Sequence, residues 1–213
     1  MRYLALAVLI LFFFSSSTVF AAKPVSPGSG KGFEPIPGSV CIDAGHGGGD
    51  IGATNKDLLE KDVNLQVAFL LKERLKGAGH IVFMTREDDS TLSNADRYNY
   101  CDLQKAAILI SIHHNGSTDP SVDYTTALYM KKKDMPLAQI VAETVSSQLD
   151  LSNHGVLSFA SGVLIKSDMP ATISEGFFLT NSTEYNLIKN SNRLEQEADA
   201  LFDAITTYFA AYP

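Results

Sequence analysis

Cysteine is scarce in this sequence, and basic residues are outnumbered by acidic ones. The only two cysteines, Cys41 and Cys101, have neither the CxxC nor the Cys/His spacing of a structural zinc site, so that kind of site is excluded. The 17 lysines and arginines face 24 acidic residues, which gives a formal net charge of −7. Nucleic-acid-binding proteins normally carry a basic surplus, so we expect no nucleic-acid partner.

The two cysteines leave two alternatives open. A single disulfide is permitted in an exported protein, but the spacing of the pair does not require it. Cys41 lies in an apolar run, where the sequence favours a buried free thiol.

Three common glycine-rich motifs are incomplete. In "GSGKG" (28–32), Val25 stands at the first glycine position of a phosphate-binding loop and Gly32 follows the lysine. "GHGGGD" (45–50) lacks the third glycine of the dinucleotide fingerprint, and no Gly-x-Ser-x-Gly accompanies the "HGGG". A metal site is the remaining interpretation of His46. The glycines after it would let the backbone pass close to a metal without Cβ clashes.

The first residues predict export. Arg2 precedes an apolar stretch from Leu4 to Phe14, too short for a comfortable membrane span, and small residues follow. We predict a signal peptide over 1–21, with an uncleaved anchor as the alternative, and a Pro/Gly/Ser-rich linker over 22–38. One folded catalytic domain over 39–213 is expected, secreted to a periplasm or the cell wall without a membrane span in its mature form.

The hydrophobic pattern of that domain alternates between strand-like and helix-like segments, which predicts an α/β sandwich around a mainly parallel sheet. Ser93, with Asp96 three residues on, predicts the start of one helix. The expected strands are 40–45, 81–86, 106–115, 126–131, 162–167 and 171–178, and the expected helices are 60–79, 93–106, 137–149 and 194–212.

Two histidines close apolar strands. His46 and His113 each follow such a run, and Glu60 begins the first long helix, where a carboxylate also interacts favourably with the helix dipole. Two histidines and one carboxylate are a known ligand set for catalytic zinc, with a fourth position left for water. His114 would point to the opposite side of the strand from His113, as packing or support. His80 and His154 are expected in a solvated turn and a loop.

Glu175 ends a strand of apolar and small residues, where a carboxylate is costly to bury unless it is paired or functional. As a functional group it would take a proton from water and deliver one to a leaving amine. As a structural group it would form a salt bridge with Arg86 or Arg97. The chemistry alone leaves both readings open.

Taken in order, the motifs "IDAGHGGGDIGA", "LEKDVNL", "MTR", "ILISIHHN" and "SEGFFLTNSTE" resemble the zinc-dependent N-acetylmuramoyl-L-alanine amidases of the amidase-3 type, which cut bacterial peptidoglycan. The likeness extends from Val40 to the C-terminus. It implies Zn²⁺ as the cofactor, His46, Glu60 and His113 as its ligands, and Glu175 as the catalytic residue. It also implies a twisted mixed sheet of about six strands between helices, in a three-layer sandwich.

Two features depart from the family pattern. His114 stands where the family often has alanine or cysteine. The 62 positions from His113 to Glu175 are too few for the regulatory helix that blocks some division amidases, which argues against activator control and identifies no activator. We expect a monomer acting on peptidoglycan.

Two other functions remain as alternatives. A zinc carboxypeptidase acting on cell-wall peptides would need a basic clamp for a terminal carboxylate, for which Arg86 or Arg97 would serve. A non-catalytic wall-binding module would lack a ligand or the base, whereas all four positions are filled here.

Overall fold

The computed structural model describes residues 33–213. The predicted signal peptide (1–21) and most of the predicted linker (22–38) lie outside the described residues. Among those described, no helix has the length and apolar character needed to span a membrane.

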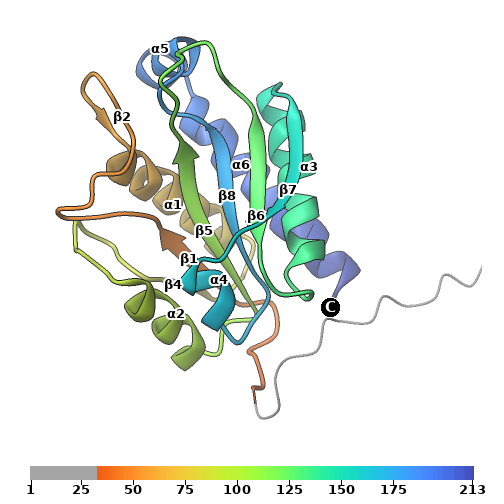
Figure 1. Cartoon of the computed structure of the whole chain (residues 1–213). Coiled ribbons are helices and arrows are strands. Elements are labelled where there is room, and N and C mark those ends of the chain that lie inside the picture. The colour runs from red at the N-terminus through yellow and green to blue at the C-terminus, as the bar shows by residue number, and fades with distance from the viewer. Residues whose placement is uncertain (1–32) are drawn as a thin grey trace, which may run out of the picture.

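A six-stranded sheet forms the centre of the structure (Figure 1). Four neighbouring strands are parallel, and the fifth, β6, runs antiparallel to β8 and parallel to the edge strand β7. This arrangement confirms the predicted mixed, mainly parallel sheet. In spatial order the strands are β4 (Val82–Met84), β1 (Val40–Ala44), β5 (Ile108–Asn115), β8 (Ala171–Phe178), β6 (Thr125–Tyr129) and β7 (Asn153–Ser158).

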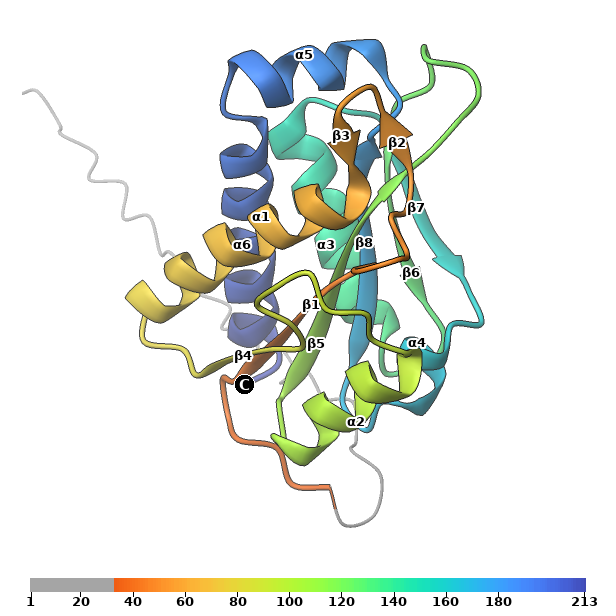
Figure 2. The same ribbon diagram turned by 90° about the vertical axis from the view of Figure 1, so that its left-hand side faces the viewer.

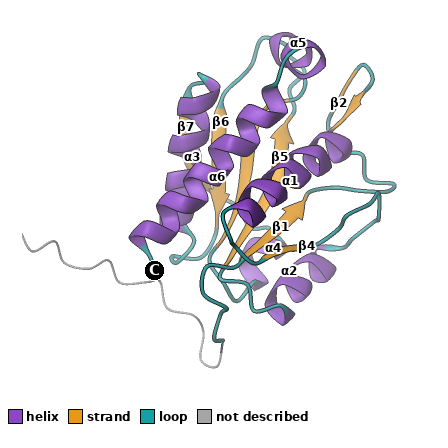
Figure 3. Ribbon diagram, turned by 180° about the vertical axis from the view of Figure 1, so that it is seen from behind, coloured by secondary structure: helices purple, strands orange, loops and turns teal. Residues whose placement is uncertain are grey.

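Helices cover both faces of the sheet, as the three-layer prediction requires. One face carries the three long helices α1 (Glu60–Gly77), α3 (Met135–Leu149) and α6 (Arg193–Ala211), seen in front of the sheet in Figure 3. The other face carries α2 (Asn94–Leu103) and the short α4 (Gly162–Lys166). Figure 2 shows α5 (Ser182–Asn190) at one end of the sheet, beside the hairpin β2 (Thr54–Asn55) and β3 (Leu58–Leu59).

The central strands carry runs of apolar residues because helices cover both faces of the sheet. Alternate residues of a strand point to opposite faces. Ile42 and Ile110 therefore join the core beneath the three long helices, while Leu109 and Ile173 join a smaller core beneath α2 and α4. Burial on both faces removes the polar alternation that a half-exposed strand would show.

The predicted helix starts lie within about two residues of the observed ones, with or without a capping side chain. Ser93 caps α2 and forms a capping box with Asp96, as expected. The first long helix begins at Glu60 and buries Val63, Val67 and Leu71 along one side.

Several short elements differ from the prediction. Residues 162–167, expected as a strand, form α4, whose Val163 and Leu164 enter the smaller core. A short apolar run does not distinguish a strand from a buried helical turn. The expected loop at His154 is instead the edge strand β7. The hairpin β2–β3 and helix α5 were not predicted.

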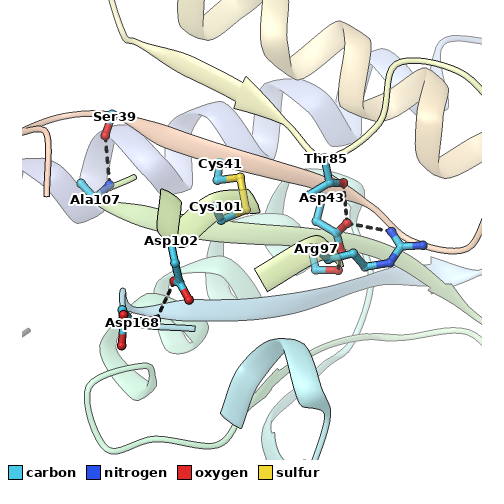
Figure 4. The surroundings of a disulfide bond; sticks show 10 residues. Ser39, Cys41, Asp43, Thr85, Arg97, Cys101, Asp102, Ala107 and Asp168 are labelled. Carbon is cyan, nitrogen blue, oxygen red and sulfur yellow. Dashed lines mark hydrogen bonds and ion pairs between the residues drawn. A yellow bond between two sulfur atoms is a disulfide. The ribbon is translucent and has the colours of Figure 1, made fainter. Parts of the chain in front are cut away.

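The preference for a free thiol at Cys41 was wrong, because Cys41 and Cys101 form a disulfide (Figure 4). Cys41 points from β1 into the smaller core, and Cys101 on α2 meets it there with a Cα–Cα distance of 5.7 Å. The same strand and helix are joined again by the ion pair of Asp43 and Arg97. The burial that favoured a free thiol therefore also brings the second cysteine within bonding distance.

Candidate metal centre and active site

Three of the predicted site residues meet where parallel strands end. His46 follows β1, His113 lies near the end of β5, and Glu60 is the first residue of α1. Ligand sites in open α/β sheets form at such carboxyl ends. Glu60 Oε1 lies 3.0 Å from His46 Nε2 and 3.1 Å from His113 Nδ1. One ligand atom from each residue lies within 4.8 Å of the other two, close enough to hold a single metal ion.

Backbone and side-chain contacts fix the orientation of this cluster. The second oxygen of Glu60, Oε2, accepts a hydrogen bond from the Ala53 amide at 2.7 Å, and Oε1 accepts one from the His114 amide at 3.1 Å. Asp50 Oδ2 lies 2.9 Å from Nδ1 of His46, on the side away from Glu60. A carboxylate behind a ligating imidazole is a common way to orient it toward a metal.

Two glycines leave room for the cluster, but they are not the glycines directly after His46 that the sequence indicated. A Cβ at Gly45 would overlap the His113 ring, and one at Gly52 would overlap Glu60 and His46. Gly47 and Gly48, which follow His46, instead face Ser90 and Thr91, and nothing lies within 4 Å of a Cβ at Gly49. Gly47 and Gly48 therefore accommodate a neighbouring loop, while Gly45 and Gly52 leave space for the candidate ligands.

The loop that carries His46 is held by arginine. The backbone of His46 has φ = 60°, a conformation that non-glycine residues adopt rarely. Arg97 Nη2 donates to the His46 carbonyl at 2.8 Å, and Arg97 Nη1 donates to Asp43 at 2.7 Å. Arg86 donates to the carbonyls of Ala44 and Gly45, both at 2.9 Å. Neither arginine forms the salt bridge with Glu175 that was one of the two readings of that residue.

Asp43 is the buried acceptor at the centre of this network. Burial alone would raise the pKa of Asp43, but Arg97 and the hydroxyls of Ser111 and Thr85 hold it below the usual range. Asp43 is therefore an anion whose hydrogen bonds connect three elements of the fold. Asp43 is the only charged residue of β1, and no role was predicted for it from the sequence.

Glu175 faces the same cavity as the histidines. It pairs with His113 in the register of β5 and β8, and register partners in neighbouring strands point to the same side. Its Oε2 is buried and has no hydrogen-bond partner among the described residues. Burial raises the pKa of Glu175, and the nearby His113 opposes this rise.

The other three histidines are not among the candidate metal ligands, although the backbone amide of His114 contacts Glu60. His114 points to the opposite face from His113, as predicted, and is buried against Phe177 with a ring-centroid distance of 4.1 Å. His80, expected in solvent, is half-buried, with Nδ1 2.8 Å from the Gly38 carbonyl and its ring stacked on Phe209. His154 lies in the edge strand β7 and stacks on Tyr124.

A cavity of about 520 Å³ opens over the cluster. Its polar side includes the three candidate ligands and Glu175, and its apolar side includes Leu128, Phe159 and Ile173. Phe159 is 52% exposed, so this wall of the cavity reaches the surface.

The charges of the three candidate ligands fit a cation. Burial opposes ionisation of Glu60, but the two imidazoles hold the pKa of that carboxyl far below its usual range. Burial likewise opposes a charge on His46, yet Glu60 and Asp50 raise the pKa of His46 to about 9. A proton on Nε2 of His46 lies toward Glu60, where the three candidate ligands face one another. Two imidazoles and a carboxylate also form one of the known donor sets of catalytic zinc.

Comparison with known proteins identifies the family of this chain. The chain matches the family Amidase_3, described as N-acetylmuramoyl-L-alanine amidase, over residues 40–207. It is 32% identical over 180 residues to YqiI of Bacillus subtilis (strain 168), covering 83% of this chain and 87% of that protein. It is 29% identical over 175 residues to the N-acetylmuramoyl-L-alanine amidase LytC of the same strain, covering 80% of this chain but only 35% of LytC.

A solved structure extends the likeness to three dimensions. The N-acetylmuramoyl-L-alanine amidase from Clostridium difficile 630 superposes with a TM-score of 0.77 at 32% identity, covering 83% of this chain and 99% of that one. The family match includes the strands and the helix that carry the site. The chain therefore belongs to the N-acetylmuramoyl-L-alanine amidase family, Amidase_3.

Proposed function

We propose that this protein is a secreted, zinc-dependent hydrolase of peptidoglycan. It would cleave the amide between the lactyl group of N-acetylmuramic acid and the L-alanine of the stem peptide. Zn²⁺ would be held by His46, Glu60 and His113. One observation carries this proposal: the three ligand atoms lie within 4.8 Å of one another, and Glu175, whose Oε2 has no hydrogen-bond partner among the described residues, faces the same cavity.

Zinc held by these residues would supply polarisation of the scissile carbonyl and a lowered pKa, of about 7, for a water molecule. The residues of the chain would supply the proton transfers and the contacts with substrate. Glu175, with no competing hydrogen bond on Oε2, would accept a proton from water and then pass it to the leaving amine of L-alanine. Burial raises its pKa, which makes the carboxylate a better proton acceptor and suits a general base. The apolar wall with Phe159 would contact the substrate beside the scissile amide.

Two features support export. The first 21 residues have the pattern of a signal peptide, ahead of a linker over 22–38 and a catalytic domain over 39–213. The disulfide between Cys41 and Cys101 is a bond that persists in oxidising compartments and is rare in the cytosol. We propose a monomer that works in a periplasm or at the cell wall.

The structure disfavours the carboxypeptidase alternative. That activity needs a free basic group to bind a terminal carboxylate, and Arg86 or Arg97 was the candidate. Four hydrogen bonds from Arg86 go to backbone carbonyls, and Arg97 is divided between Asp43 and backbone carbonyls. Most of the N–H donors of both arginines are therefore already in use.

The proposal is tested on purified protein with zinc and intact sacculi, by analysis of the released products. Amidase action exposes the amino group of L-alanine on the freed stem peptides and leaves the glycan strands intact. Single terminal amino acids would instead indicate a carboxypeptidase. A protein that sediments with sacculi and releases nothing would be a wall-binding module, and either result would overturn the proposal.

A further inference from the structure

A buried polar chain lies behind the candidate metal centre, on the opposite face of β5. It contains Glu197 of α6, His114 of β5 and Asn64 of α1, and all three side chains are buried. His114 Nε2 lies 2.9 Å from Glu197 Oε2, and His114 Nδ1 lies 2.7 Å from Asn64 Oδ1. Glu197 and His114 are 83 positions apart in the sequence, so only the fold brings them together.

The orientation of Asn64 connects these buried polar residues to the candidate metal centre. Its Nδ2 donates to the Gly45 carbonyl at 3.1 Å and to Glu60 Oε1 at 3.5 Å. Because Nδ2 faces two acceptors, Oδ1 is left to accept from His114. A change on the His114 side would therefore turn the amide that contacts both Glu60 and the residue before His46.

Besides the link through Asn64, His114 contacts Glu60 directly through its backbone. Its amide donates to Glu60 Oε1 at 3.1 Å, the same oxygen that lies close to both candidate histidine ligands. The His114 side chain, held between Glu197 and Asn64 and packed on Phe177, restrains the position of that amide.

Glu197 also touches the strand that carries Glu175. Gly176 packs directly against Glu197, and a Cβ at Gly176 would overlap its carboxylate. Glu197 Oε1 has no hydrogen-bond partner among residues 33–213. One buried carboxylate of α6 is thus in contact both with the residue next to Glu175 and with His114.

We infer that Glu197, His114 and Asn64 are positioning residues that fix the carboxylate of Glu60, so that metal affinity depends on helix α6. The inference rests on the metal site of the proposed function. If the role of these residues were purely structural, the buried ion pair would contribute to stability and leave metal affinity unchanged. Substitution of residues that support a metal ligand typically lowers the affinity of the site for its metal by about 10- to 100-fold.

The test is Glu197→Gln, which keeps the shape of the side chain and removes its charge. Zn²⁺ affinity is measured by competition with a chromophoric chelator, and the visible absorption of the Co²⁺-loaded protein reports ligand geometry. We expect the dissociation constant for Zn²⁺ to rise about tenfold and the Co²⁺ bands to change. Glu184→Gln is the matched control, because Glu184 is equally buried and paired with Arg193 but has no contact with the site. It should lose stability and keep the parent affinity and spectrum.

A second variant covers the case in which Glu197→Gln does not fold. The double substitution His114→Leu, Glu197→Leu replaces the buried pair by apolar groups, a change that folded proteins often tolerate. It should also bind Zn²⁺ about tenfold more weakly than the parent. Parent-like affinity and Co²⁺ spectrum in either folded variant would overturn the inference. If the parent itself binds neither metal, the proposed metal site fails instead.

Discussion

At the scale of single residues, Glu175 combines two properties that rarely occur together. It is a carboxyl group whose Oε2 is buried, and that oxygen has no hydrogen bond within the described part of the chain. Burying such a group costs free energy, and a stable fold would normally compensate it with a partner. Arg97 lines the same cavity but is bound to Asp43.

We expect Glu175→Gln to keep the metal and lose turnover. The amide preserves the shape of the side chain but cannot accept and return a proton, so kcat should fall by about 10²- to 10⁴-fold. Metal content is measured by elemental analysis, and turnover by dye release from labelled sacculi. Glu143→Gln, an exposed substitution on α3, is the control and should behave like the parent. Parent-like turnover in Glu175→Gln would reject the assigned role.

Gly45 offers a second residue-scale prediction. A methyl group at this position would overlap the His113 ring, so Gly45→Ala should displace the imidazole and weaken Zn²⁺ binding by at least about tenfold. Gly49→Ala is the matched control in the same loop, because a Cβ there meets nothing within 4 Å. Chelator competition on both variants gives the measurement. Equal affinities would show that His113 does not need its present position to bind metal.

The sequence predicted the four central residues of the candidate site but not their supports. His46, His113 and Glu175 stand at strand ends and Glu60 at a helix start, which are positions that a hydrophobic pattern reveals. The contact of Asp50 with His46 and the clearance that Gly45 leaves for His113 depend on distances between segments. One-dimensional spacing carries no information on such distances.

At the scale of elements, the disulfide attaches α2 to β1 (Figure 4). It closes a loop of 60 positions, and a crosslink of this kind restricts the unfolded chain. Replacing both cysteines by alanine should lower the free energy of unfolding by about 2–5 kcal/mol, as measured by urea denaturation. Adding a reductant should destabilise the parent similarly and leave the double variant unchanged. An unchanged parent under full reduction would contradict this expectation.

Element length explains which parts of the fold were predictable. The long helices α1, α3 and α6 present several turns of buried residues, so their period is clear in the sequence. Helix α4 has five residues and each strand of the β2–β3 hairpin has two, too few to establish a period. The edge strand β7 contains Gly155 and a register shift against β6, which hides the alternation expected of a strand.

At the scale of the whole molecule, the acidic balance limits how substrate arrives. The net charge of −7 gives no long-range attraction to an anionic wall polymer, so binding must come from contacts in the cavity. The apolar wall formed by Leu128, Phe159 and Ile173 can provide contacts that do not depend on charge.

The stability of the whole metal-free protein should depend on pH through its site. Glu60 and Asp50, against the effect of burial, raise the pKa of His46 to about 9, compared with 6.5 for an ordinary histidine. The folded state therefore binds more protons than the unfolded state between these values, and stability falls as pH rises across that range. Although burial opposes it, Glu197 raises the pKa of His114 as well, which adds to the same trend.

We expect the melting temperature in chelator to be highest below pH 6.5 and to decrease as the pH approaches 9. Zn²⁺ displaces the proton of His46, so the stabilisation gained on adding zinc should increase over the same interval. His46→Asn should reduce the slope in chelator without abolishing it, because His114 still titrates. Thermal denaturation from pH 6 to pH 9, with and without zinc, makes the measurement. A metal-free protein whose melting temperature rises with pH would mean that no proton is held between Glu60 and Asp50, and that the site does not bind cations as its geometry implies.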